Sequence, residues 1–176
     1  MRLPYLLSAT ALSLSFCLPA SATTFAFGAT LSNVGEPIPT STGTGFASVV
    51  FDDVLLKVSV NETFANLVNP ATFAHLHCCT AAAFTGNAGA ALGFTGFPSA
   101  KSDNYVNSFI LAPAAFNSLL AGTQAGKAYL NIHSAAPYTG GEIRGFLVPV
   151  PEPGTYALML AGLGLLGLAA RRGQRR

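Results

Sequence analysis

The sequence predicts an all-β protein, an Ig-like or Greek-key β-sandwich of about seven to eight antiparallel strands. Two observations lead to this class. Short runs rich in Val, Phe, Leu and Ala alternate apolar and polar positions, which is the period of a half-buried strand. Clusters of Gly, Pro, Ser, Thr and Asp separate these runs, as turns between strands require. Apolar segments flank the sandwich and divide the chain into residues 1–22, 23–149 and 150–176.

The first half of the central segment contains the clearest hairpin. A first strand is expected over residues 25–31, and Gly- and Pro-rich breaks follow it. Residues 47–51 and 54–61 then alternate on either side of a tight turn at Asp52-Asp53. In this register one face of the second strand carries Val54, Leu56, Val58 and Val60, and the other carries Leu55, Lys57, Ser59 and Asn61.

The second half supplies the remaining elements. Strands are expected over residues 73–77, 105–111, 128–133 and 142–147. A short helix is expected over residues 113–121, with Pro113 at its start and Gly122 at its end. Residues 80–102 are rich in Gly, Ala and Thr without a clear period, which indicates a long loop with room for one irregular strand.

Residues 1–22 are predicted to be a secretory signal peptide. Arg2 gives the positive N-terminal region, residues 3–18 are mostly apolar, and Ala20-Ser21-Ala22 fits the small-x-small pattern of a cleavage site. The mature chain is therefore expected to begin at Thr23.

The C-terminal segment combines a rigid turn, an apolar stretch and a basic end. Pro151-Glu152-Pro153 precedes an uncharged apolar run of 15 residues, 156–170, and Arg171 and Arg172 follow it. A helix needs ~20 residues to cross a bilayer core, but the long arginine side chains extend the usable length. The arginines are expected on the cytoplasmic side, with everything before Pro151 outside.

These three parts, in this order, resemble a PEP-CTERM sorting signal. The resemblance implies a Gram-negative bacterium that makes exopolysaccharide, and a membrane exosortase that cuts at or near Pro151-Glu152-Pro153. The precursor would pass through the secretion machinery and sit transiently in the inner membrane through residues 156–170. The mature protein would then reach the cell surface or the extracellular matrix. An ordinary single-span membrane anchor is the alternative interpretation.

The charge of the central segment argues against a nucleic-acid partner. The full chain has a formal net charge of +2, but residues 23–149 contain four basic and six acidic side chains, which gives −2. Binding to a phosphate backbone relies on clustered Lys and Arg, and no such patch is present there. The segment also lacks a P-loop, a dinucleotide-binding fingerprint and a Ser-His-Asp arrangement, so no enzymatic activity is expected.

The central segment resembles a CHRD domain along almost its whole length. The matching blocks are residues 27–32, 36–39, 43–47, 74–77 (Ala-His-Leu-His), 129–134 (Tyr-Leu-Asn-Ile-His-Ser) and 141–145 (Gly-Glu-Ile-Arg-Gly). The resemblance implies an extracellular β-sandwich with no agreed catalytic residues. We therefore expect a structural or binding role at the surface or in a biofilm matrix, with exopolysaccharide as a candidate partner.

The three histidines of the chain, all within these blocks, form a candidate metal site. Strand alternation places His75 and His77 on one face of their strand, and His133 on the corresponding face of another. If the apolar residues of these strands face the core, all three imidazoles lie on outer faces. There a His-x-His pair and a third histidine can chelate a divalent ion such as Cu or Zn, with Asp103 or Glu142 as candidates to complete the shell.

Two alternatives remain open for the histidines. The first is redox catalysis, because copper–zinc superoxide dismutases use a similar pairing of histidines on a Greek-key barrel, although an analogy of fold does not establish the activity. The simplest alternative is structural, with the imidazoles hydrogen-bonded to loop backbone at one end of the sandwich.

Cys78 and Cys79 directly follow the His-x-His strand. An exported protein encounters an oxidising environment, and no other cysteine remains in residues 23–149. The pair can form a vicinal disulfide, stay free or link two chains, or provide a thiolate metal ligand beside His75 and His77.

Overall fold

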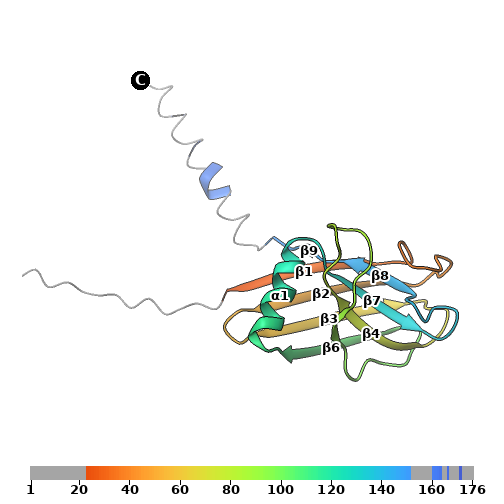
Figure 1. Ribbon diagram of the computed structural model, residues 1–176. Helices are drawn as coiled ribbons and strands as arrows, with labels where there is room; N and C mark the ends of the chain where they lie inside the picture. The colour runs from red at the N-terminus through yellow and green to blue at the C-terminus, as the bar shows by residue number, and fades with distance from the viewer. Residues whose placement is uncertain (1–22, 152–159, 164–165, 167–170, 172–176) are drawn as a thin grey trace, which may run out of the picture.

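The computed structural model describes residues 23–151, 160–163, 166 and 171. Residues 23–151 form two stacked antiparallel sheets and one helix (Figure 1). The five-stranded sheet has the order β6-β3-β2-β1-β9, and the four-stranded sheet has the order β5-β4-β7-β8. The elements are β1 (Thr24–Leu31), β2 (Thr44–Asp52), β3 (Lys57–Ala65), β4 (Ala71–His77), β5 (Ala90–Gly93), β6 (Asp103–Ile110), α1 (Pro113–Gln124), β7 (Tyr129–Ser134), β8 (Ile143–Phe146) and β9 (Val148–Pro149). The all-β sandwich is thus confirmed, with nine strands in the described part.

The β2–β3 hairpin forms with a longer turn than the sequence predicts. Pairing is regular from Thr44–Ala65 to Asp52–Lys57, so residues 53–56 leave the strand. The Asp52 carboxylate accepts hydrogen bonds from the backbone N–H groups of Val54 (3.1 Å) and Leu55 (2.9 Å). Such local side-chain bonds compete with strand pairing. The prediction that the second strand begins at Val54 was therefore wrong, because Val54 lies in the turn and is exposed.

Two strands are too short to be recognised from alternation. β5 lies within the stretch 80–102 and pairs with β4 beside a register shift between Leu76 and His77. β9 pairs with β1 through Phe27–Pro149 and Gly28–Val148. Strands of two to four residues display too few positions to show a period.

The core lies between the inner faces of the two sheets. Its largest fully buried apolar side chains are Leu31, Val49, Phe51, Val58, Leu76, Phe116, Leu130, Ile132, Ile143 and Leu147. The alternating residues of β2 and β3 supply one wall, and the apolar residues of β4 and β7 supply the other. This packing fixes which residues of β4 and β7 must face outward.

Helix α1 closes one end of the sandwich, next to β9 (Figure 1). It begins at Pro113, whose fixed φ and missing N–H suit the first helical turn. Phe116 is fully buried and meets the ring of Phe51 edge-on, with 5.8 Å between centroids. The helix does not end at Gly122 as predicted but continues to Gln124, so this glycine lies inside it.

Several sequence predictions concern residues outside the described part. They are the signal peptide over 1–22, Glu152 and Pro153 of the sorting motif, most of the apolar run 156–170, and Arg172. Residues 160–163 are helical. Among the described residues, no helix has the length and hydropathy needed to span a bilayer.

Candidate metal centre

The fold brings the three histidines together on the outer face of the four-stranded sheet. His75 and His77 come from β4 and His133 from β7, its neighbour in the sheet. In the register of this pair, His75 lies opposite Asn131 and His133 lies opposite Phe73. The apolar residues of both strands face the core, so alternation places the three imidazoles on one face, as expected.

The distances within this group suit a single metal ion. One ring nitrogen from each histidine lies within 4.8 Å of the others. Nδ1 of His75 and Nε2 of His133 are 3.3 Å apart. Metal–nitrogen bonds of about 2.0–2.1 Å in a tetrahedral shell hold two ligand nitrogens roughly 3.3 Å apart. The His75–His133 pair therefore already has the separation that a shared ion requires.

Backbone carbonyls fix the tautomers of two of the rings. Nδ1 of His77 donates to the Ala88 carbonyl (2.9 Å), and Nδ1 of His133 donates to the Thr139 carbonyl (3.0 Å). A carbonyl can only accept, so the proton is on Nδ1 and the lone pair is on Nε2 in each ring. Metal-binding histidines usually have such a partner on their other nitrogen. Nε2 of His77 is buried and has no hydrogen-bond partner among the described residues.

The surroundings of the three rings favour their neutral form. Burial lowers the pKa of both His75 and His77. The charge of His77 lowers the pKa of His75 further, and the charge of Arg144 lowers the pKa of His77 further. Burial and the two other histidines lower the pKa of His133 to about 4. At neutral pH the imidazoles therefore offer lone pairs, which is the state a metal needs.

Two loops cover the outer face of this sheet. This coverage was not predicted from the sequence. Loop 33–41 brings in Glu36, whose Oε1 accepts a hydrogen bond from Nδ2 of Asn131 (2.9 Å). Loop 80–89 brings in Asn87, whose Oδ1 accepts from Arg144 (2.6 Å). Asn131, His133 and Arg144 are consequently no more than 7% exposed. No local pattern around Glu36 or Asn87 distinguishes them from ordinary loop residues.

The two acidic residues considered as further ligands lie elsewhere. The Glu142 carboxylate accepts hydrogen bonds from Oγ of Ser41 (2.7 Å), from the backbone N–H of Val68 (2.5 Å) and from Oγ of Ser134. Asp103 is at the exposed start of β6, in the other sheet. Among the described residues, the cluster with ligand spacing consists of the three histidines.

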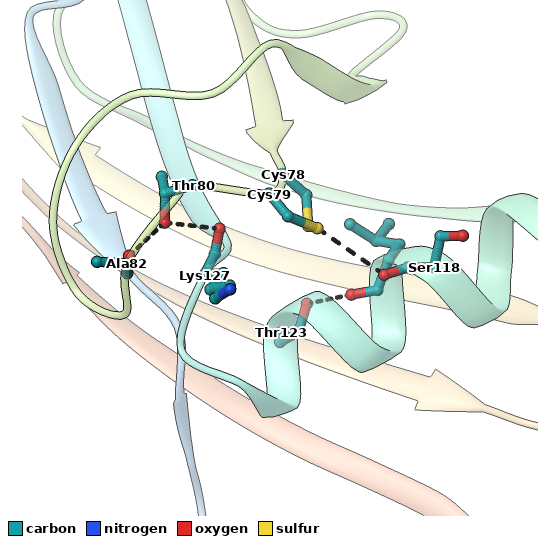
Figure 2. The surroundings of a disulfide bond; sticks show 8 residues. Cys78, Cys79, Thr80, Ala82, Ser118, Thr123 and Lys127 are labelled. Atoms are coloured by element: carbon teal, nitrogen blue, oxygen red, sulfur yellow. Dashed lines mark hydrogen bonds between the residues drawn. A yellow bond between two sulfur atoms is a disulfide. The ribbon is translucent and has the colours of Figure 1, made fainter.

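Cys78 and Cys79 are joined in a vicinal disulfide immediately after His77 (Figure 2). The disulfide lies over α1, where Sγ of Cys79 is 3.9 Å from the Ser118 carbonyl oxygen. Both sulfur atoms occupy the space that a Cβ on Gly122 would take. The disulfide therefore packs the end of β4 against α1, and this contact explains why a glycine lies inside the helix.

Replacing Gly122 by Ala is expected to reduce the free energy of unfolding by about 1–3 kcal/mol, because the new methyl group meets both sulfur atoms. The usual effect in a helix interior is the opposite, a gain of about 0.5–1 kcal/mol. Urea-induced unfolding of the oxidised protein measures the change. In a Cys78→Ala/Cys79→Ala background the same substitution should be neutral or stabilising. An equal loss in both backgrounds would contradict the packing argument.

The chain is similar to two family models. A model of the CHRD domain matches residues 27–147, and a model of the PEP-CTERM protein-sorting motif matches residues 149–176. The first match contains all three histidines and the cysteine pair. The second contains Pro151, Glu152, Pro153, Arg171 and Arg172. Searches of curated proteins and of solved structures found no significant match.

Proposed function

Because the chain belongs to the CHRD domain family, with a PEP-CTERM protein-sorting motif after the domain, we propose that it is a non-enzymatic metal-binding protein of the cell surface or extracellular matrix. The sorting motif implies an exported precursor that transits a membrane and is recognised by an exosortase. We propose two further points: the protein associates with exopolysaccharide in the matrix, and it binds a metal ion.

The arrangement of His75, His77 and His133 is the observation that supports metal binding. Nε2 of His77, Nε2 of His133 and Nδ1 of His75 would hold the ion. Three neutral imidazoles are a donor set that suits Zn or Cu, whereas Ca and Mg prefer oxygen ligands. The buried, unpartnered Nε2 of His77 also favours a ligand, since an unpaired polar atom in the interior costs free energy. A tetrahedral shell would keep one position for water or a further ligand.

Metal titration of the exported protein, purified without a His-tag, tests the proposal. We expect one Zn or Cu ion per chain by calorimetry. His75→Ala should weaken binding by at least about 100-fold, because it removes one of three ligands. This side chain is the best choice for mutation, since it makes no bond to a loop, whereas His77 bonds Ala88 of loop 80–89 and His133 bonds Thr139 of the β7–β8 connection.

Asn104→Ala is the matched control. Asn104 is exposed on β6, in the other sheet, so its truncation should leave binding unchanged. Unchanged stoichiometry in a His75→Ala/His77→Ala double variant that still melts cooperatively would rule out the metal site. The structural alternative for the histidines would then stand.

Redox catalysis is the competing function for the same residues. With copper bound, such a site supplies one-electron redox chemistry, of which superoxide dismutation is an example. Our proposal expects no dismutation by the copper-loaded protein above that of the same amount of free copper. Dismutation that disappears in His75→Ala would replace a binding role by a catalytic one.

Processing can be checked by the mass of the protein found outside the cell. Loss of residues 1–22 and of the segment after the Pro151-Glu152-Pro153 motif is expected. An intact C-terminal segment in the mature product would instead favour a permanent membrane anchor.

A further inference from the structure

A pocket of about 380 Å³ lies beside the metal centre, at the β8 edge of the four-stranded sheet. It is formed between the loop after β1 and the loop after β4, and none of the three histidines lines it. Its size is within the range of small-molecule sites, which is roughly 300–1,000 Å³. Its walls include a cation, two aromatic rings and two hydroxyl side chains, contributed by Arg144, Phe84, Phe146, Ser32 and Thr85.

Arg144 is held rigidly in the pocket wall. Its guanidinium lies 4.5 Å from the ring centroid of Tyr129 and 5.5 Å from that of Phe146. It donates hydrogen bonds to Oδ1 of Asn87 (2.6 Å) and to the Gly86 carbonyl (2.9 Å). A guanidinium has more N–H groups than these two acceptors use. It is therefore a fixed donor for a planar anion such as a carboxylate, with little rotamer entropy left to lose.

Negative charge near the pocket balances the positive charge of Arg144 only in part. Among the residues that the structure describes, no acidic side chain lines the pocket. The charge of Arg144 lowers the pKa of Glu36, but burial outweighs this effect and raises that pKa to about 7. A substantial fraction of Glu36 is thus neutral near pH 7, and its Oε1 is already bonded to Asn131. An anion in the pocket would meet a net positive potential.

The aromatic wall is preformed although it faces solvent. Phe84 is 54% exposed, yet its backbone N–H donates to the Gly126 carbonyl (2.8 Å) and its ring lies directly over Gly126. The ring meets Phe146 edge-on, with 6.2 Å between centroids. The negatively polarised face of an aromatic ring attracts C–H groups of positive character, such as those on the apolar side of a pyranose. A cation beside two such rings fits a sugar that also has a carboxylate.

We propose that this pocket binds a uronic-acid unit of an acidic polysaccharide, with Arg144 on the carboxylate and the two phenylalanines on the apolar side of the sugar ring. The inference rests on the matrix role proposed above, and it names the chemical class of the polysaccharide. The pocket and the metal centre share no lining residue, although the charge of Arg144 lowers the pKa of His77.

Calorimetric titration with a short oligogalacturonate tests the proposal, using the full exported domain in EDTA at pH 7 and low salt. We expect saturable binding that weakens as salt is added, because the attraction is between opposite charges. Phe84→Ala and Arg144→Gln should each reduce affinity at least about tenfold, since each removes one of the two recognition elements. Phe46→Ala is the matched control: Phe46 is also 54% exposed, but it lies on β2 in the other sheet, and its loss should change nothing.

Each outcome bears on the pocket alone. Arg144→Gln removes bonds to loop 80–89 and could loosen that loop. Phe84→Ala removes only an exposed ring, so this variant still tests the pocket if the loop changes in Arg144→Gln. Equal binding of neutral dextran, or full affinity in a folded Phe84→Ala variant, would overturn the proposal. Absence of oligogalacturonate binding by a protein that still takes up one Zn would also overturn it while leaving the metal site standing. Binding of free acetate with equal strength would show a simple anion site instead of a sugar site.

Discussion

Glu62→Gln is expected to remove the largest single contribution to the loss of stability that occurs between pH 4.5 and 8. Glu62 lies on the core-facing side of β3, between Ala47 of β2 and Tyr105 of β6, and is fully buried. Neither of its carboxyl oxygens has a hydrogen-bond partner among the described residues. Burial raises its pKa from 4.5 to about 8, so the folded protein holds it as the neutral acid at pH 7.

The direction of the effect follows from the two pKa values. Below pH 4.5 the carboxyl is protonated in both the folded and the unfolded chain, and it does not oppose folding. Above that pH the unfolded chain releases the proton while the folded chain retains it, so stability falls as pH rises towards 8. At 1.36 kcal/mol for each pH unit over which only the unfolded chain is ionised, the loss between pH 4.5 and 8 is about 4 kcal/mol. A neutral Gln has no such dependence.

Urea-induced unfolding of both proteins at a series of pH values measures this effect. The free-energy difference between Glu62→Gln and the wild type should rise by about 4 kcal/mol from pH 4.5 to 8. Taking the difference cancels the contributions of Glu36 and His133, which titrate in both proteins. A difference that does not vary with pH would mean that Glu62 ionises normally in the folded state.

Glu142→Ala is expected to cost roughly 4 kcal/mol of unfolding free energy. Its carboxylate joins three separate parts of the chain through Ser41, Val68 and Ser134, and it is fully buried. Truncation leaves two hydroxyls and one backbone N–H without their acceptor in the interior. Each buried group left unpaired costs about 1–3 kcal/mol.

The matched control for Glu142 is Ser41→Ala, which removes one of the three bonds to Glu142 and also the bond that Oγ of Ser41 accepts from the backbone N–H of Gly43 (2.9 Å). It should cost about 2 kcal/mol in the same denaturation experiment. Glu142→Ala should also make loop 33–41 more sensitive to proteases, since Ser41 is one of its anchors. If Glu142→Ala costs no more than Ser41→Ala, the three-bond cluster does not hold the loops as argued.

The strand pattern was predictable because alternation is a local property. The burial of Ala74 and Leu76, and of Leu130 and Ile132, follows from period two once the apolar residues face the core. The same period selected His75, His77 and His133 as residues with outward side chains. Errors arose where a side chain competed with the backbone, as Asp52 does in the β2–β3 turn, or where a strand was too short to show alternation.

The sequence by itself determined the all-β class, the C-terminal sorting motif and the identity of the three candidate ligands, because periodicity, composition and short motifs are properties of neighbouring residues. Only the tertiary structure decided that β4 and β7 are adjacent, that loops 33–41 and 80–89 bury the outer face of their sheet, and that Gly122 lies under a disulfide. These contacts join residues far apart along the chain, and their formation depends on how the loops pack against the finished sheets, which no local pattern specifies.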